Sequence, residues 1–278
     1  MDITTFLVVI LAAFLHSSWN LFVKKGRDQF RSLSLMAATS GVICLLALPF
    51  APPLDPAAWW FLAASAPLHA GYRIFLSAGY RYGDMSQVYP IARGAIPLFV
   101  LPLSLIFVNA DVSGVQIGAV LTIALGIMGL TFVRGIPTNY HAVGFALVTA
   151  AFVACFTLLD AEGAALGGQA ITYILWVFLL EGLLMLLAGL VAGPRAFLAY
   201  TAENWKICTA SGFVMSLAHA LIIWALSRSE VALVSALREV SVVMTMIFGS
   251  LVLRERLGLQ KAACTILVLF GIAAIALN

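Results

Sequence analysis

The amino-acid sequence predicts an all-α membrane protein with ten transmembrane helices, built as two inverted five-helix repeats. Three observations predict this fold: the composition, an internal repeat and the distribution of charge between the loops. Of the 278 residues, 63% are hydrophobic and 10% are charged, and the mean hydropathy is +1.07. Soluble proteins carry about 25% charged residues. The composition therefore excludes a large solvated domain, and the net charge of +3 gives no indication of nucleic-acid binding.

Ten apolar runs have the length of a membrane-spanning helix. A bilayer core about 30 Å thick needs about 20 apolar residues in a helix. Short connections that hold Pro, Gly and charged residues separate the runs, and the connection near 135–139 divides a first repeat, 1–136, from a second repeat, 137–278. The runs cover approximately 4–23, 32–50, 58–79, 86–108, 114–133, 142–160, 170–191, 206–226, 231–252 and 260–277.

Short segments recur along the chain at a nearly constant offset. An acid, a Gly and a Gln occur at the same spacing in 111–116 and in 255–260, which lie 144 residues apart. Three further pairs have similar offsets: 83–86 with 229–232 (146), 12–14 with 150–152 (138) and 40–41 with 181–182 (141). Each repeat contains five predicted helices, an odd number, so the second repeat must enter the membrane from the opposite side. Such inverted repeats are a recurrent plan of secondary transporters.

The charged residues support the same topology. Three of the fifteen Lys and Arg residues lie inside predicted helices, and eleven of the other twelve fall in alternate loops. The positive-inside rule places these loops in the cytoplasm and both chain ends outside, in a bacterial inner membrane. The eleven are Lys24, Lys25, Arg27, Arg31, Arg81, Arg134, Arg195, Lys206, Arg254, Arg256 and Lys261. The opposite loops carry Asp55, Asp111, Asp160 and Glu162, with Arg228 as the exception.

With these repeats, the chain resembles the EamA-type transporters of the drug/metabolite transporter superfamily. The resemblance rests on the ten helices, on the acid-x-x-Gly-x-Gln motifs, and on Gly126 and Gly271 deeper in the same helices. It implies a secondary transporter that exports a small polar metabolite by alternating access. The segment His16-Ser-Ser-Trp19-Asn20 is similar to a subgroup associated with phosphonate metabolism.

Ionisable side chains within the predicted helices are the candidates for the substrate site. A charged group at the bilayer centre costs about 2.5 to 3.5 kcal/mol on insertion scales, so it is expected to face water, a partner or a ligand. The first helix presents His16, Trp19 and Asn20 on one face, since their spacings are three and four residues. Arg73, with Tyr72 beside it, and His219 are equivalent positions in the two repeats, 146 residues apart.

The fourth and ninth helices carry a second set of charges. Tyr89 and Arg93 lie on one face of the fourth helix, and Arg238 and Glu239 lie in the ninth. Two interpretations remain open: the arginines bind an anionic substrate, or Arg and Glu form a structural ion pair. The fourth helix contains three prolines and the ninth none, so we expect a bend in the fourth helix only.

Glu181 lies near the middle of the seventh helix. A carboxyl group in hydrocarbon can exchange a proton, so Glu181 and Glu239 are candidate coupling groups; the alternative is a hydrogen-bonded or Arg-paired Glu. Trp224 is a further candidate for the cavity wall. By contrast, Asp160 at the end of the sixth helix is expected only to cap it, and His69 to be a hydrogen-bonded histidine of the bundle.

The intramembrane Arg and His residues favour an amino-acid-like zwitterion or an organic anion as substrate. The alternatives are a flippase of a lipid-linked or amphipathic substrate and a multidrug or organic-cation exporter. No HExxH or GxSxG motif is present, so an enzyme is not predicted. The four cysteines occur singly, which predicts no metal and no cofactor. The expected partners are the small-molecule substrate and the bilayer, with the chain a monomer or a weak homodimer.

Overall fold

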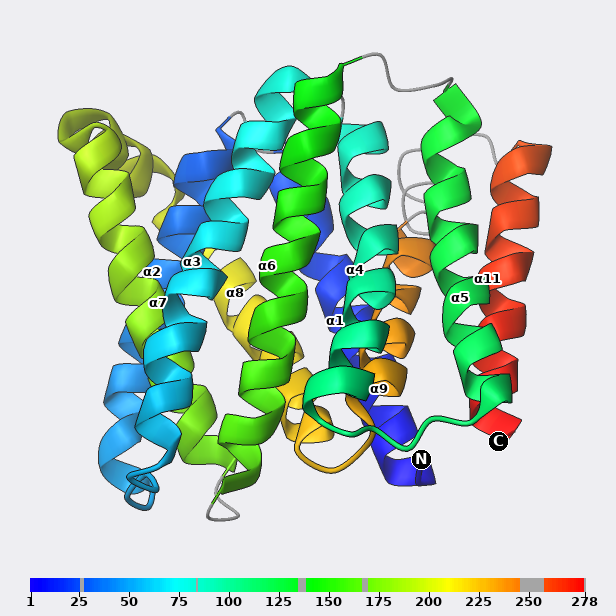
Figure 1. Ribbon diagram of the computed structural model, residues 1–278. Helices are drawn as coiled ribbons and strands as arrows, with labels where there is room; N and C mark the ends of the chain where they lie inside the picture. The colour runs from blue at the N-terminus through cyan, green and yellow to red at the C-terminus, as the bar shows by residue number, and fades with distance from the viewer. Residues whose placement is uncertain (26–27, 84, 135–138, 167–169, 246–257, 278) are drawn as a thin grey trace.

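The computed structural model describes residues 1–25, 28–83, 85–134, 139–166, 170–245 and 258–277. These residues form helices and connections, and no strand occurs among them (Figure 1). The first half contains α1 (Ile3–Lys25), α2 (Gln29–Ala47), η1 (Leu48–Phe50), α3 (Ala58–Tyr82), α4 (Met85–Phe107), α5 (Gly114–Gly129) and η2 (Leu130–Arg134). The second half contains α6 (Tyr140–Ala165), α7 (Ala170–Ala192), α8 (Pro194–Leu226), α9 (Val231–Arg238) and α11 (Leu259–Leu277). The predicted all-helical class is confirmed.

Seven helical segments in the described part of the chain are long and apolar enough to cross a membrane. They lie in α2, α4, α5, α6, α7, α8 and α11, while α1 contains a shorter apolar stretch, Ile3–Trp19. The predicted total of ten transmembrane helices stays a prediction. Polar residues set several helix starts: Asp28 accepts a hydrogen bond from the Arg31 amide at 2.9 Å, and Ser113 forms a capping box with Gln116.

The two halves make reciprocal contacts with each other. Helix α3 packs on α6, and the equivalent helices α8 and α1 pack on each other in the same way. In addition, α2 packs on its own equivalent α7, and α5 packs on its own equivalent α11. A two-fold relation between the halves produces this pattern, because equivalent elements then meet at the axis and other contacts occur in pairs. Figure 1 shows both termini at one end of the molecule and the start of α6 at the other end.

Glycines at the α5–α11 contact follow the same two-fold relation. A Cβ atom added to Gly126 would lie 3.0 Å from the Cys264 carbonyl oxygen and 2.7 Å from Val268. A Cβ atom added to Gly271 would lie 2.8 Å from the Ala119 carbonyl oxygen and 2.6 Å from the Ile123 side chain. Ala119, Ile123 and Gly126 each lie 145 residues before their counterparts Cys264, Val268 and Gly271. Glycine therefore allows the two backbones to approach, which is how small residues act in membrane helix pairs.

The same geometry recurs where α2 crosses α7. The equivalent residues Gly41 and Gly182 face each other, and a Cβ atom on Gly182 would lie 2.6 Å from the Ala37 carbonyl oxygen. Glu181 precedes Gly182, so this close crossing fixes the depth of its carboxylate in the bundle.

Three helix boundaries differ from expectation. Helix α6 continues to Ala165, beyond the predicted end at 160, so Asp160 lies inside the helix and is buried. Helix α8 begins at Pro194 rather than near 206, because proline is well accommodated in the first turn. The predicted helix 231–252 is interrupted: α9 ends at Arg238, Glu239 forms a turn, and helix resumes over 240–245. Residues 246–252 of that prediction lie outside the described residues.

The bend expected in the fourth helix stays a prediction, whereas the ninth helix is interrupted where no irregularity was expected. Helix α4 is continuous from Met85 to Phe107 although it contains three prolines, whereas the break occurs in the helix without proline. At the break the Glu239 amide donates to the Ala236 carbonyl at 3.1 Å, a tighter i→i+3 bond. Such local tightening is typical of a strained or functional helix position.

Candidate functional site

Two buried ion pairs occupy the interior of the bundle. In the first, the Arg73 guanidinium from α3 contacts the Glu181 carboxylate from α7, and both side chains are at most 2% exposed. Arg73 Nη1 also lies 3.1 Å from the Met215 sulfur on α8. The sequence left open whether Glu181 is a lone or a paired carboxyl group. Its pairing with Arg73 joins the two halves of the chain.

The second ion pair lies at the break after α9. Arg93 Nε on α4 lies 2.9 Å from Glu239 Oε2, and Arg93 Nη2 donates to the Ser241 hydroxyl at 3.1 Å. Arg238 Nε is 3.9 Å from Glu239 Oε1, so one carboxylate faces two guanidinium groups. Among the described residues, neither Glu239 oxygen accepts a well-directed hydrogen bond and Arg238 Nε has no hydrogen-bond partner. The geometry is thus an ion pair that is incompletely hydrogen-bonded.

Two histidines connect the ion pairs. His16 Nε2 on α1 lies 3.2 Å from Arg93 Nη2, and its ring is 5.5 Å from the ring of His219 on α8. His219 Nδ1 donates to the Met215 carbonyl at 2.9 Å, so its Nε2 is left as an acceptor. In the described part of the chain His219 Nε2 and the nearby Trp19 Nε1 are buried without a hydrogen-bond partner. Such unpaired groups are costly, and a ligand could satisfy them.

The central cluster, defined here as His16, Arg73, Glu181, His219, Arg93, Arg238 and Glu239, carries a surplus of positive charge. Three guanidinium groups face two carboxylates, and all five side chains are buried. Arginine keeps its proton in proteins, so the surplus is permanent when the histidines are neutral. Burial of an unbalanced charge is unfavourable, and an anionic ligand would reduce that cost.

Aromatic residues line the cluster. The Arg73 guanidinium carbon lies 5.2 Å from the Tyr72 ring centre, and that of Arg93 lies 5.6 Å from the Tyr89 ring centre. Both distances suit cation–π contacts. The Arg228 guanidinium carbon lies 4.7 Å from the Trp224 ring centre, and the predicted place of Trp224 in the cavity wall stays a prediction. The Asn20 side chain lies outside the described residues, so its predicted role stays a prediction.

Sequence reasoning missed a second buried polar cluster, which surrounds Asp160. Asp160 Oδ2 lies 2.8 Å from His69 Nε2, and its Oδ1 accepts hydrogen bonds from the Ser65 hydroxyl and, at 3.1 Å, from the Tyr173 hydroxyl. Asp160 and His69 are each 1% exposed. The signal that could have found this cluster is the spacing of Ser65 and His69, four residues apart on one helix face. The role of Asp160 as a cap is wrong because α6 continues past it.

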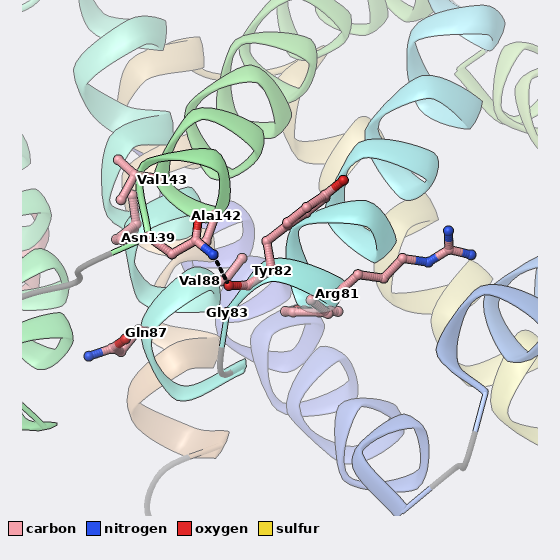
Figure 2. A pocket seen from close by; sticks show the side chains of 10 residues that line it. Arg81, Tyr82, Gly83, Gln87, Val88, Asn139, Ala142 and Val143 are labelled. Atoms are coloured by element: carbon pink, nitrogen blue, oxygen red, sulfur yellow. Dashed lines mark hydrogen bonds between the residues drawn. The ribbon is translucent and has the colours of Figure 1, made fainter.

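A pocket of about 420 Å³ lies where α3, α4 and α6 meet (Figure 2). Asn139 Nδ2 donates to the Tyr82 carbonyl at 2.7 Å across its wall, and Arg81 is exposed beside it. Tyr80 belongs to the lining and also lies within electrostatic range of Arg93. The lining of the pocket is Tyr80, Arg81, Tyr82, Gly83, Gln87, Val88, Ile91, Asn139, Ala142 and Val143.

Within the described ranges, no group of three or more His, Cys, Asp or Glu residues is arranged to hold a metal ion.

The sequence model of the EamA-like transporter family matches residues 3–132 and 141–277. No curated protein matches the chain. A solved structure named only "Crystal structure of protein" superposes with a TM-score of 0.81 and 15% sequence identity, covering 100% of this chain and 98% of the other. At this identity the likeness shows a shared fold and gives no information about the substrate.

Proposed function

Because the chain belongs to the EamA-like transporter family, we propose that it is a secondary transporter of a small anionic or zwitterionic metabolite. The observation that carries this proposal is the buried surplus guanidinium of Arg238, whose Nε has no hydrogen-bond partner among the described residues. A carboxylate, phosphonate or phosphate group has the charge and the acceptor oxygens that such a site requires. Alternating access exposes this site to each side of the membrane in turn.

Substrate binding would open the Arg93–Glu239 contact. An incoming anion competes with Glu239 for Arg93 and Arg238, and the ion pair is held without a well-directed hydrogen bond. His219 Nε2 can accept a hydrogen bond from the substrate, and Trp19 Nε1 can donate one. When released from the arginines, Glu239 can face an ammonium group. A zwitterion would therefore satisfy more of the site than a simple anion.

We propose an inverted topology of ten transmembrane helices, with 1–136 and 137–278 as the two units and both termini outside a bacterial inner membrane. The reciprocal glycine contacts and the common end of the two termini support this topology. The alternate loop charges support the orientation. Labelling of single cysteines at Asp111 and Arg81 from each side of right-side-out vesicles tests it. The cysteine at position 111 should react only from outside, and the cysteine at position 81 only from the cytoplasmic side.

The pocket in Figure 2 is the proposed access route from the cytoplasmic side. It lies beside Arg81, one of the residues that the positive-inside rule places in the cytoplasm. Tyr80 belongs to this lining and interacts electrostatically with Arg93. In export, the substrate would enter from the cytoplasm by this route.

Solute flux in proteoliposomes tests the function. We expect counterflow of at least one amino acid, aminophosphonate or organic acid, and a fall of at least tenfold in Arg238→Gln, since loss of a buried charge contact costs about 2 to 5 kcal/mol. Arg228→Gln is the matched control, because Arg228 is exposed and forms no ion pair with a residue of the central cluster within the described ranges. Flux of none of these solutes, or equal flux in both variants, would contradict the proposal.

A further inference from the structure

Three carboxylates are buried among the described residues, and they have different neighbours. Glu181 faces Arg73, and Glu239 faces Arg93 and Arg238. Arginine does not release its proton, so both glutamates meet a permanent positive charge. Asp160 instead faces an imidazole and two hydroxyl groups. Within the described ranges, no Lys or Arg side chain forms an ion pair with Asp160.

We infer that Asp160 and His69 form the proton-binding pair that couples transport to a proton gradient, a role that the sequence assigned to Glu181 and Glu239. The inference rests on the proposed function and adds the coupling ion and its site. One proton from water binds the Asp160–His69 pair on one side of the membrane, and the same proton leaves to water on the other side. No other bond is made or broken.

The surroundings of the pair allow it to take up a proton. His69 Nδ1 has no hydrogen-bond partner among the described residues, so the ring can carry its proton on either nitrogen. The His69 ring stacks on the Phe156 ring with 3.7 Å between the ring centres, and this stacking keeps Nε2 directed at the Asp160 carboxylate. The other titratable or charged groups near the pair are Tyr173 on α7, Arg73 one turn along α3, His219 on α8 and the exposed Glu162 on α6. Of these, Tyr173 contacts Asp160 directly.

Protonation of Asp160 would change a contact between the two halves. An ionised carboxylate only accepts hydrogen bonds, and Asp160 accepts them from Ser65, His69 and Tyr173. A protonated carboxyl has an O–H group that must donate. Either one of the three donors then loses its acceptor, or His69 Nε2 accepts the new bond and the ring proton moves to Nδ1, which has no hydrogen-bond partner among the described residues. Ser65 and His69 belong to the first half, whereas Asp160 and Tyr173 belong to the second. Proton binding therefore weakens an inter-repeat contact, which is the kind of contact that alternating access must break.

The position of the pair suits proton uptake from outside. Asp160 lies near the end of α6 and Tyr173 in the first turn of α7, and Figure 1 shows this junction at the end of the molecule that holds both termini. The loop charges place that end outside the cell. His69 lies one helical turn from Arg73 in the central cluster, so the two sites share helix α3. Movement of α3 can thus transmit proton binding to the substrate site.

Infrared spectroscopy of the protein in liposomes tests proton binding without a substrate. Lowering the pH should produce the C=O band of a buried protonated carboxyl group in the wild type. The band should be absent in Asp160→Asn, shifted in frequency in Tyr173→Phe, and unchanged in the control Asp111→Asn, which alters an exposed loop carboxylate. A band that persists in Asp160→Asn, or no band in the wild type, would overturn the inference.

Solute accumulation in proteoliposomes under a pH gradient tests the coupling of transport to protons. The solute is whichever amino acid, aminophosphonate or organic acid shows counterflow. For one proton per solute, a gradient of about one pH unit supports about tenfold accumulation. Asp160→Asn and His69→Gln should keep counterflow but lose this accumulation, whereas Asp111→Asn should keep both. Tenfold accumulation in Asp160→Asn would refute the coupling role. Flux of no solute would refute the proposed function alone, since the infrared titration still reports on Asp160.

Discussion

The central cluster and the Asp160 cluster bury carboxylates in opposite ways. In the central cluster each glutamate is opposed by arginine, and the contacts Arg73–Glu181 and Arg93–Glu239 join helices of different halves. In the Asp160 cluster the carboxylate is surrounded by hydroxyl groups and an imidazole. Burial alone therefore does not identify a proton carrier. The group that faces the carboxylate matters as well, because a guanidinium keeps its charge whereas an imidazole can accept and release a proton.

The largest expected effect comes from breaking the Arg73–Glu181 pair. Arg73→Met and Glu181→Met should each lower the free energy of unfolding by about 3 to 5 kcal/mol, because each leaves one buried charge without a partner. The double variant should be more stable than either single variant. Chemical denaturation in detergent measures all three. Additive losses in the double variant would show that the two side chains do not act as a pair.

Overpacking the α2–α7 crossing should have the next largest effect. Gly182→Val places atoms against the Ala37 carbonyl, where a Cβ atom already approaches to 2.6 Å, and should cost about 1 to 3 kcal/mol of stability. Gly144→Val is the control, since a Cβ atom there meets no atom within 4 Å. Because Glu181 is adjacent, the change should also disturb the central cluster and leave proton binding at Asp160 intact. Equal stability of the two variants would argue against a close crossing.

A single donor removed from Asp160 should have a smaller effect. Tyr173→Phe should lower stability by about 1 kcal/mol, because Ser65 and His69 still hold the carboxylate. Tyr140→Phe is the control, since Tyr140 is 87% exposed. Thermal unfolding of the two variants measures the difference. A loss as large as that of Glu181→Met would mean that the Asp160 cluster is a structural lock like the central pair.

The smallest effect is expected at the pocket. Val143→Trp fills space beside Tyr82 and Ala142 and should slow uptake from the Arg81 side about threefold, which is less than 1 kcal/mol in the barrier. Val148→Trp changes the same residue type on the same helix at a 38% exposed position and should have no effect. The pH dependence should be equal in both variants, since the lining of the pocket includes neither Asp160 nor His69. An altered pH dependence in Val143→Trp would connect the pocket to Asp160 instead.

The sequence predicts the all-helical class, the family and most of the buried charged residues. Hydropathy and length predict a helix well, because a bilayer requires a long apolar segment. The cost of intramembrane charge likewise singled out Arg73, Arg93 and Glu181, which are all buried in the structure. These properties depend on local composition and could be predicted without knowing which helices touch.

Which polar groups contact each other depends on the tertiary structure. Arg73 and Glu181 are 108 residues apart, and His69 and Asp160 are 91 residues apart, so their pairing depends on how α3 packs on α6 and α7. Asp160 was assigned to a helix end because the apolar run weakens there, yet three donors from neighbouring helices compensate its burial. The break at Glu239 likewise occurs without a Pro or Gly nearby, and two guanidinium groups face its carboxylate there. Sequence shows that a buried charge needs a partner, and packing selects the partner.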